Sequence, residues 1–73
     1  MEQVDARGLS CPEPAMMARE ALIRGESDEV EVLVDSATSR DNVLRVGQQL
    51  GWESSAEDRG GGNYALIFRR RSA

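Results

Sequence analysis

The sequence predicts an α/β fold, specifically an α+β two-layer sandwich with two helices on one face of a four-stranded mixed sheet. The first observation is the order of the hydrophobic patterns along the chain, which is β-α-β-α-β-β. The second is the length of 73 residues, which suits one domain with a small core. The third is a content of 40% hydrophobic and 30% charged residues, ordinary for a globular protein. We therefore expect residues 1–73 to form a single domain whose second sheet face is partly open.

The first half of the chain is expected to hold two strands and one helix. Residues 3–5 fit a short strand, and Gly8 allows the turn that follows it. Residues 12–24 have helical periodicity, and Gly25 is a natural helix end. The apolar arc of this helix contains Pro14, Ala15, Met17, Ala18, Ala21 and Leu22. Residues 29–34 alternate between valines and other side chains, which predicts a half-buried strand.

The second half is expected to hold one helix and a hairpin. Residues 35–41 are rich in capping side chains and start the second helix, which Gly51 ends. Its apolar stripe consists of Val43, Val46, Gly47 and Leu50. Gly47 costs about 1 kcal/mol relative to alanine in a helix, so we expect close packing there as compensation. Residues 52–58 fit a weak strand, 59–63 a loose connection, and 64–70 the last strand.

The segment Gly8-Leu9-Ser10-Cys11-Pro12-Glu13-Pro14 holds the only cysteine and the only two prolines. Proline suits the first turn of a helix, so Cys11 is expected at or just before a helix N-terminus. The helix dipole and free N–H groups there favour a thiolate. If Cys11 is the N-cap, the Glu13 amide is the expected donor to the sulfur. The negative charge of the Glu13 carboxylate opposes formation of the thiolate. The alternative is a buried structural cysteine.

Several functional classes are excluded by residues that the sequence lacks. There is no histidine and no lysine, so a Cys–His hydrolase and a lysine Schiff base are excluded. Cys11 alone cannot make a conventional zinc site, and we expect no metal and no cofactor. A net charge of −4 argues against stable nucleic-acid binding. No apolar run approaches the roughly 20 residues of a membrane span, no signal pattern is seen and no internal disulfide is possible, so a cytoplasmic location is expected.

Two surface features have more than one interpretation. Met16 and Ile23 fall on the polar arc of the first helix together with Arg19. They either contact a neighbouring strand or loop, or form a partner-docking patch beside the thiol. The run of arginines at 69–71 is expected to be a solvated tail, with a positive patch for an acidic partner as the alternative.

The segment from Val4 to Pro14, followed by Met16, Met17 and Arg19, resembles the TusA/SirA-like family of sulfur carriers. The resemblance rests on a Cys-Pro-x-Pro core preceded by Asp-x-x-Gly-Leu, and it extends over the whole chain. Residues 42–64 look closer to the YedF-like branch, which has been linked to selenium metabolism.

The resemblance implies that Cys11 carries a persulfide, with Gly8, Leu9, Pro12, Glu13 and Pro14 as its structural setting. It implies a cysteine desulfurase or rhodanese-type protein as sulfur donor and a downstream acceptor protein. Uses of the sulfur in such a family include tRNA thiolation, molybdenum-cofactor synthesis and dissimilatory sulfur metabolism. The chemistry agrees, because a second cysteine within reach would attack the persulfide, and this chain has none.

Two other functions stay open at this point. One is a non-catalytic protein- or RNA-binding regulatory module in which Cys11 only starts a helix. The other is a redox sensor that forms an intermolecular disulfide through the unpaired cysteine.

Overall fold

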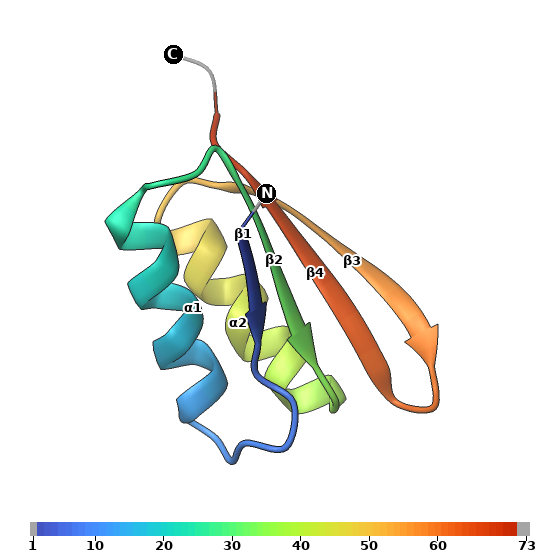
Figure 1. Ribbon diagram of the computed structural model, residues 1–73. Helices are drawn as coiled ribbons and strands as arrows, with labels where there is room; N and C mark the ends of the chain where they lie inside the picture. The colour runs from blue at the N-terminus through green and yellow to red at the C-terminus, as the bar shows by residue number, and fades with distance from the viewer. Residues whose placement is uncertain (1, 72–73) are drawn as a thin grey trace.

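The computed structural model describes residues 2–71 and has the predicted order of elements (Figure 1). These are β1 (Glu2–Asp5), α1 (Glu13–Arg24), β2 (Glu29–Val34), α2 (Ala37–Gln49), β3 (Glu53–Gly60) and β4 (Asn63–Arg69). The strand order in the sheet is β1-β2-β4-β3. β1 runs parallel to β2, and the other two pairs are antiparallel. The prediction of a mixed four-stranded sheet is confirmed, and α1 supplies the crossover that a parallel pair requires.

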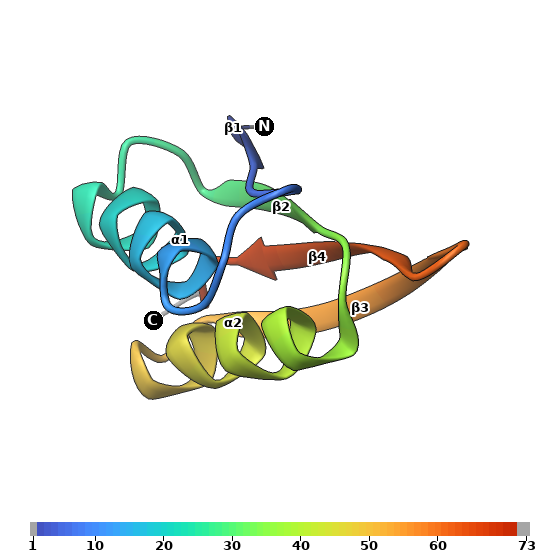
Figure 2. The ribbon, with the colours of Figure 1, turned by 90° about the horizontal axis from the view of Figure 1, so that it is seen from below.

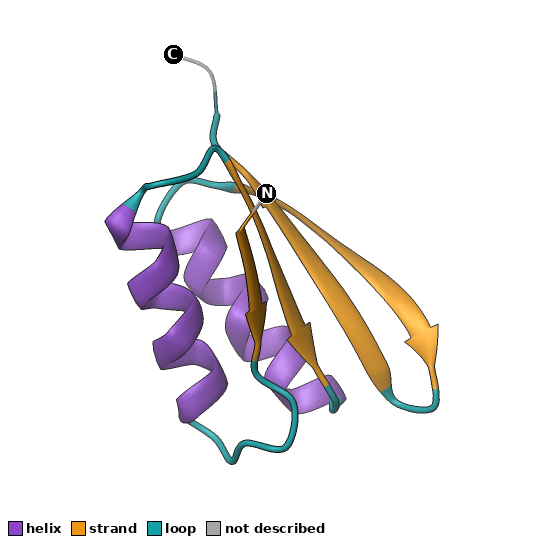
Figure 3. Ribbon diagram, viewed as in Figure 1, coloured by secondary structure: helices purple, strands orange, loops and turns teal. Residues whose placement is uncertain are grey.

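The two helices cover the same face of the sheet, as predicted (Figures 2 and 3). They also pack against each other, so the molecule has two layers. Within residues 2–71, neither helix is long and apolar enough to cross a bilayer.

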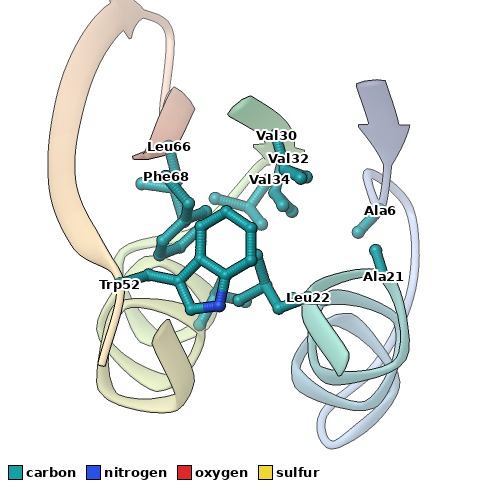
Figure 4. Packing of buried hydrophobic residues seen from close by; sticks show 11 residues of the cluster. Ala6, Ala21, Leu22, Val30, Val32, Val34, Trp52, Leu66 and Phe68 are labelled. Atoms are coloured by element: carbon teal, nitrogen blue, oxygen red, sulfur yellow. The ribbon is translucent and has the colours of Figure 1, made fainter. Parts of the chain in front are cut away.

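The core lies between the helices and the inner sheet face. The valines of β2 at 30, 32 and 34 are fully buried, and the register sets Val30 opposite Phe68 and Val32 opposite Leu66. Figure 4 shows these side chains pointing into the space that Leu22 and Trp52 also enter. Removing such a side chain from water stabilises the fold by about 1.5–3 kcal/mol. Trp52 lies just before β3 rather than within it, so the predicted strand start is wrong by one residue.

α2 approaches the sheet closely because residue 47 is a glycine. Ser36 caps the helix by accepting a hydrogen bond from the Ser39 N–H at 3.1 Å. A Cβ atom at Gly47 would fall far inside van der Waals contact with the Phe68 ring and 3.2 Å from Ser54 Oγ. The predicted close packing at this glycine is therefore confirmed.

Two residues predicted to face the core are exposed. Met17 is 37% exposed, because the buried stripe of α1 is narrow. That stripe consists of Pro14, Ala18, Ala21 and Leu22. Leu50 is 36% exposed, because α2 ends at Gln49 and Leu50 is its C-cap residue.

The hairpin between β3 and β4 is tighter than predicted. β3 continues to Gly60, and only Gly61 and Gly62 separate the two strands. Both have positive φ, 63° and 84°, which is what a two-residue hairpin turn matching the twist of the strands requires. The loose connection predicted over residues 59–63 is therefore wrong, because consecutive glycines adopt this turn without steric cost.

Ion pairs cover the sheet face that the helices leave open. Arg59 lies across β4 and pairs with Glu57 of β3 and with Glu31 of β2, the latter at 3.2 Å. Glu31 also accepts a hydrogen bond from Gln3 of β1 at 2.6 Å. Ala65, on the same face, is completely buried. The expected open face therefore carries ion pairs, and its apolar residues Leu33 and Ile67 are half-buried.

The expected solvated tail is wrong for Arg69 and Arg70. Arg69 pairs with Glu29 at 2.7 Å. Arg70 pairs with Asp28 at 3.0 Å and donates to the Gly25 carbonyl at 2.9 Å. Its guanidinium also stacks 4.9 Å from the centroid of the Trp52 ring. These contacts hold the end of β4 against the α1–β2 loop, and the alternative of a free positive patch is wrong for Arg69 and Arg70, while Arg71 is exposed.

We predict that Gly47→Ala destabilises the protein by about 1–3 kcal/mol, the usual cost of overpacking. Helix propensity alone would predict a gain of about 1 kcal/mol, so the sign of the change tests the contact with Phe68. The free energy of unfolding from urea titration measures it. Gln48→Ala, on the exposed neighbouring position, is the control and should be close to neutral.

We predict that Arg70→Met lowers the free energy of unfolding by about 1 kcal/mol, since it removes a stacking contact and two hydrogen bonds at a partly exposed site. Arg71→Met changes an exposed arginine next to it and should have a much smaller effect. Thermal unfolding of the two variants side by side measures the difference. Equal midpoints would show that Arg70 does not hold the end of β4.

Candidate functional site at Cys11

The loop that carries Cys11 joins β1 to α1 and is fastened at its start to the end of β2. The Ala6 N–H donates to the Leu33 carbonyl at 2.9 Å, and the Ala6 side chain is buried. The Gly8 N–H donates to Asp35 Oδ2 at 2.8 Å. Leu9 is half-buried and packs against the core. These contacts fix the direction in which the chain enters the segment around Cys11.

An ion pair between the loop and the end of β1 neutralises the one arginine of the loop. Arg7 donates from Nε and Nη2 to the two carboxylate oxygens of Asp5, at 2.9 and 2.8 Å. These side-chain hydrogen bonds lower the pKa of Asp5 to about 2 and raise the pKa of Arg7. The Arg7 backbone N–H adds a bond to the same carboxylate at 3.1 Å. The positive charge of Arg7 is therefore balanced by the carboxylate of Asp5.

The first turn of α1 differs from the prediction. Pro12, and not Cys11, is the residue that precedes the helix, and the Cys11–Pro12 peptide bond is cis. The Glu13 N–H donates to the Ser10 carbonyl at 2.9 Å. Because neither Pro12 nor Pro14 has an N–H, Glu13 holds the only amide donor in this stretch, and the backbone uses it. The predicted bond from the Glu13 amide to the sulfur is therefore wrong.

The Cys11 thiol is exposed, which contradicts the alternative of a buried structural cysteine. Its Sγ accepts a hydrogen bond from Asn42 Nδ2 of α2 at 3.5 Å. A small hollow lies at this junction of α1 and α2, with no room for a water molecule. It is lined by Cys11, Pro12, Pro14, Ala15, Ser39 and Asn42. On one side, the sulfur is therefore bounded by these closely packed uncharged residues, which form the floor of the site. On the other side, the sulfur is accessible from outside.

The other predicted residues separate into two groups. Gly8, with φ of +78°, and Pro14, which is buried, shape the loop and the first turn. Met16, Arg19 and Ile23 are exposed on α1, and Met16 and Ile23 are 63% and 56% exposed. These three line a shallow surface hollow together with Glu20 and Arg24. The structure thus brings the three candidate contact residues together on the helix that begins beside Cys11.

Sequence reasoning missed the contribution of α2 to this site. Asp35 and Ser39 belong to the segment identified as capping residues, but Asp35 binds the loop instead of capping α2. Nothing in the sequence singled out Asn42, because the pairing of α1 with α2 follows only from the fold. In the described part of the chain, no three His, Cys, Asp or Glu side chains lie close enough to hold a metal ion.

Comparison with known proteins identifies the family. Residues 2–70 match the family model described as "Sulfurtransferase TusA". A protein of Archaeoglobus fulgidus described as "Putative sulfur carrier protein" is 39% identical over 54 residues, covering 73% of this chain and 70% of its own. The crystal structure of a SirA-like protein from Desulfitobacterium hafniense superimposes with a TM-score of 0.84 at 30% identity, covering 94% of this chain and 96% of that one. The chain therefore belongs to the TusA family of sulfurtransferases.

Proposed function

We propose that the protein is a sulfur carrier that takes sulfane sulfur as a persulfide on Cys11 and passes it to an acceptor protein. The observation that carries the proposal is the exposed thiol of the only cysteine, at the helix start of a TusA-family chain. No observation favours a binding module in which Cys11 is purely structural, since the thiol is accessible.

The chemistry needs one thiolate and no cofactor. The Cys11 thiolate attacks the outer sulfur of a persulfide on the donor, a new S–S bond forms, and the donor S–S bond breaks. The electron pair of that bond leaves on the donor thiolate, so the transfer involves no net oxidation. Because no second cysteine is present, no thiol of the same chain can displace the sulfur from Cys11.

The proposed partners are proteins. The donor is a cysteine desulfurase or a rhodanese-type protein, and the recipient is a downstream acceptor protein. Six of the nine arginines pair with carboxylates, which leaves little free positive charge for a phosphate backbone. A cytoplasmic location and no stable nucleic-acid binding are part of the proposal, and membership of the YedF-like branch stays a prediction.

We propose that the partner contacts α1 beside the thiol. Three of the four large hydrophobic residues exposed in the described structure lie on this helix: Met16, Met17 and Ile23. Met16 and Ile23 are seven residues apart, about 10 Å along one side of the helix. On the opposite sheet face, Arg59 forms ion pairs, and none of the large hydrophobic residues exposed in the described structure lies there. A protein that reaches the Cys11 sulfur would therefore find its apolar contact on α1.

We predict that incubation with a cysteine desulfurase and cysteine adds the mass of one sulfur atom to the intact protein. The added sulfur should be removed by a reductant and map to Cys11 by peptide mass spectrometry. Cys11→Ser should gain none. A wild-type protein that stays unmodified, while the desulfurase converts cysteine to alanine and carries a persulfide itself, would contradict the carrier function.

We predict that the double variant Met16→Ser and Ile23→Ser slows sulfur transfer from the desulfurase about thirtyfold, because it removes two apolar contacts of roughly 1 kcal/mol each. Alkylation of Cys11 by a small reagent should be unchanged. The control is Leu50→Ser, which changes an exposed hydrophobic residue at the end of α2. Equal transfer rates in all three proteins would exclude this face of α1 as the contact.

A further inference from the structure

Asn42 lies in the second turn of α2, yet its side chain reaches the loop before α1. Its Nδ2 donates to Cys11 Sγ at 3.5 Å, within range for a hydrogen bond to sulfur. The residue is half-buried, and α2 is itself fixed by the contact of Gly47 with Phe68. The amide therefore sits on a rigid element, while the sulfur sits on a loop.

The hollow beside the sulfur is lined by no charged residue. The ionisable side chains of the loop and of the neighbouring turns of α1 and α2 are Arg7, Glu13, Arg40, Asp41 and Arg45, and Asp35 accepts a hydrogen bond from the loop at Gly8. Arg7 pairs with Asp5, Asp41 pairs with Arg40, and Glu13 and Arg45 are exposed. A neutral amide is therefore the polar group in contact with the sulfur.

We propose that Asn42 is a positioning residue for the sulfur transfer proposed above, on which this inference rests. Its amide N–H holds the Cys11 sulfur on the floor of the hollow and stabilises the thiolate. Hydrogen bonds to an ionised acceptor are about twice as strong as those to a neutral one, so the contact is strongest when negative charge develops on the sulfur during the transfer.

The same contact serves both halves of the transfer. Before loading, the N–H stabilises the thiolate that attacks the donor persulfide. During unloading, an acceptor thiolate attacks the outer sulfur, the S–S bond at Cys11 breaks, and its electron pair returns to Sγ. The N–H of Asn42 then stabilises the thiolate that leaves. Because the hollow has no room even for water, the outer sulfur has to point away from it, toward the partner.

The test compares Asn42→Leu, which removes the donor, and Asn42→Asp, which replaces it with a negative acceptor of the same shape. Gln48→Glu makes the same change from amide to carboxylate six residues further along α2, at an exposed position. The measurement is the rate of Cys11 alkylation by iodoacetamide as a function of pH, with thermal unfolding as a check of the fold. This readout needs no sulfur donor.

Both Asn42 variants should move the alkylation profile to higher pH, Asn42→Asp further than Asn42→Leu, and Gln48→Glu should leave it in place. At pH 7 the rate should fall only about two- to fourfold, because a more basic thiolate is also a better nucleophile. A profile that stays in place in either folded variant, or a shift in Asn42→Asp alone, would overturn the role of Asn42. Failure of the wild-type protein to accept sulfur would instead overturn the carrier function and leave the amide contact standing.

Discussion

The close contact between Gly47 and Phe68 is the constraint on which the site depends. Without a side chain at residue 47, α2 lies directly on the Phe68 ring of β4. This contact sets the height of α2 above the sheet and, through the packing of α1 on α2, the position of both helices. Ser39 and Asn42 are placed beside Cys11 by that packing. With any larger residue at this position, α2 would have to move away from the sheet. Ser39 and Asn42 would then move away from Cys11 with it.

Most of the fold could be predicted from the sequence because the strands and helices follow simple periodicities. The alternation of Val30, Val32 and Val34 has one interpretation, and the two prolines fix where α1 begins to within one residue. The wrong predictions concern residues whose positions depend on contacts with residues that are distant in the sequence. Arg70 looked like part of a solvated tail because its partners, Asp28 and the carbonyl of Gly25, are more than 40 residues away.

The candidate site could be predicted only in part for the same reason. Cys11 and the loop around it are contiguous, so their pattern was visible in the sequence. The amide expected to face the sulfur, from Glu13, is used by the backbone, and the donor that does face it comes from Asn42, 31 residues away. Local rules describe one helix start, but they cannot say which side chains a second helix brings to it. The contribution of α2 therefore appears only when both helices are seen on the sheet.

The described ends of the chain lie near each other, at the end of the sheet opposite the loop between β1 and α1 (Figure 1). Glu2 of β1 is paired with Val30, and Arg69 of β4 with Glu29, so both flank the start of β2. Cys11 follows the opposite end of β1. An affinity tag, a fluorophore or a surface anchor attached beyond either strand would consequently leave the end of the molecule that carries Cys11 accessible. The protein can thus be immobilised in a defined orientation without obstructing access to its sulfur.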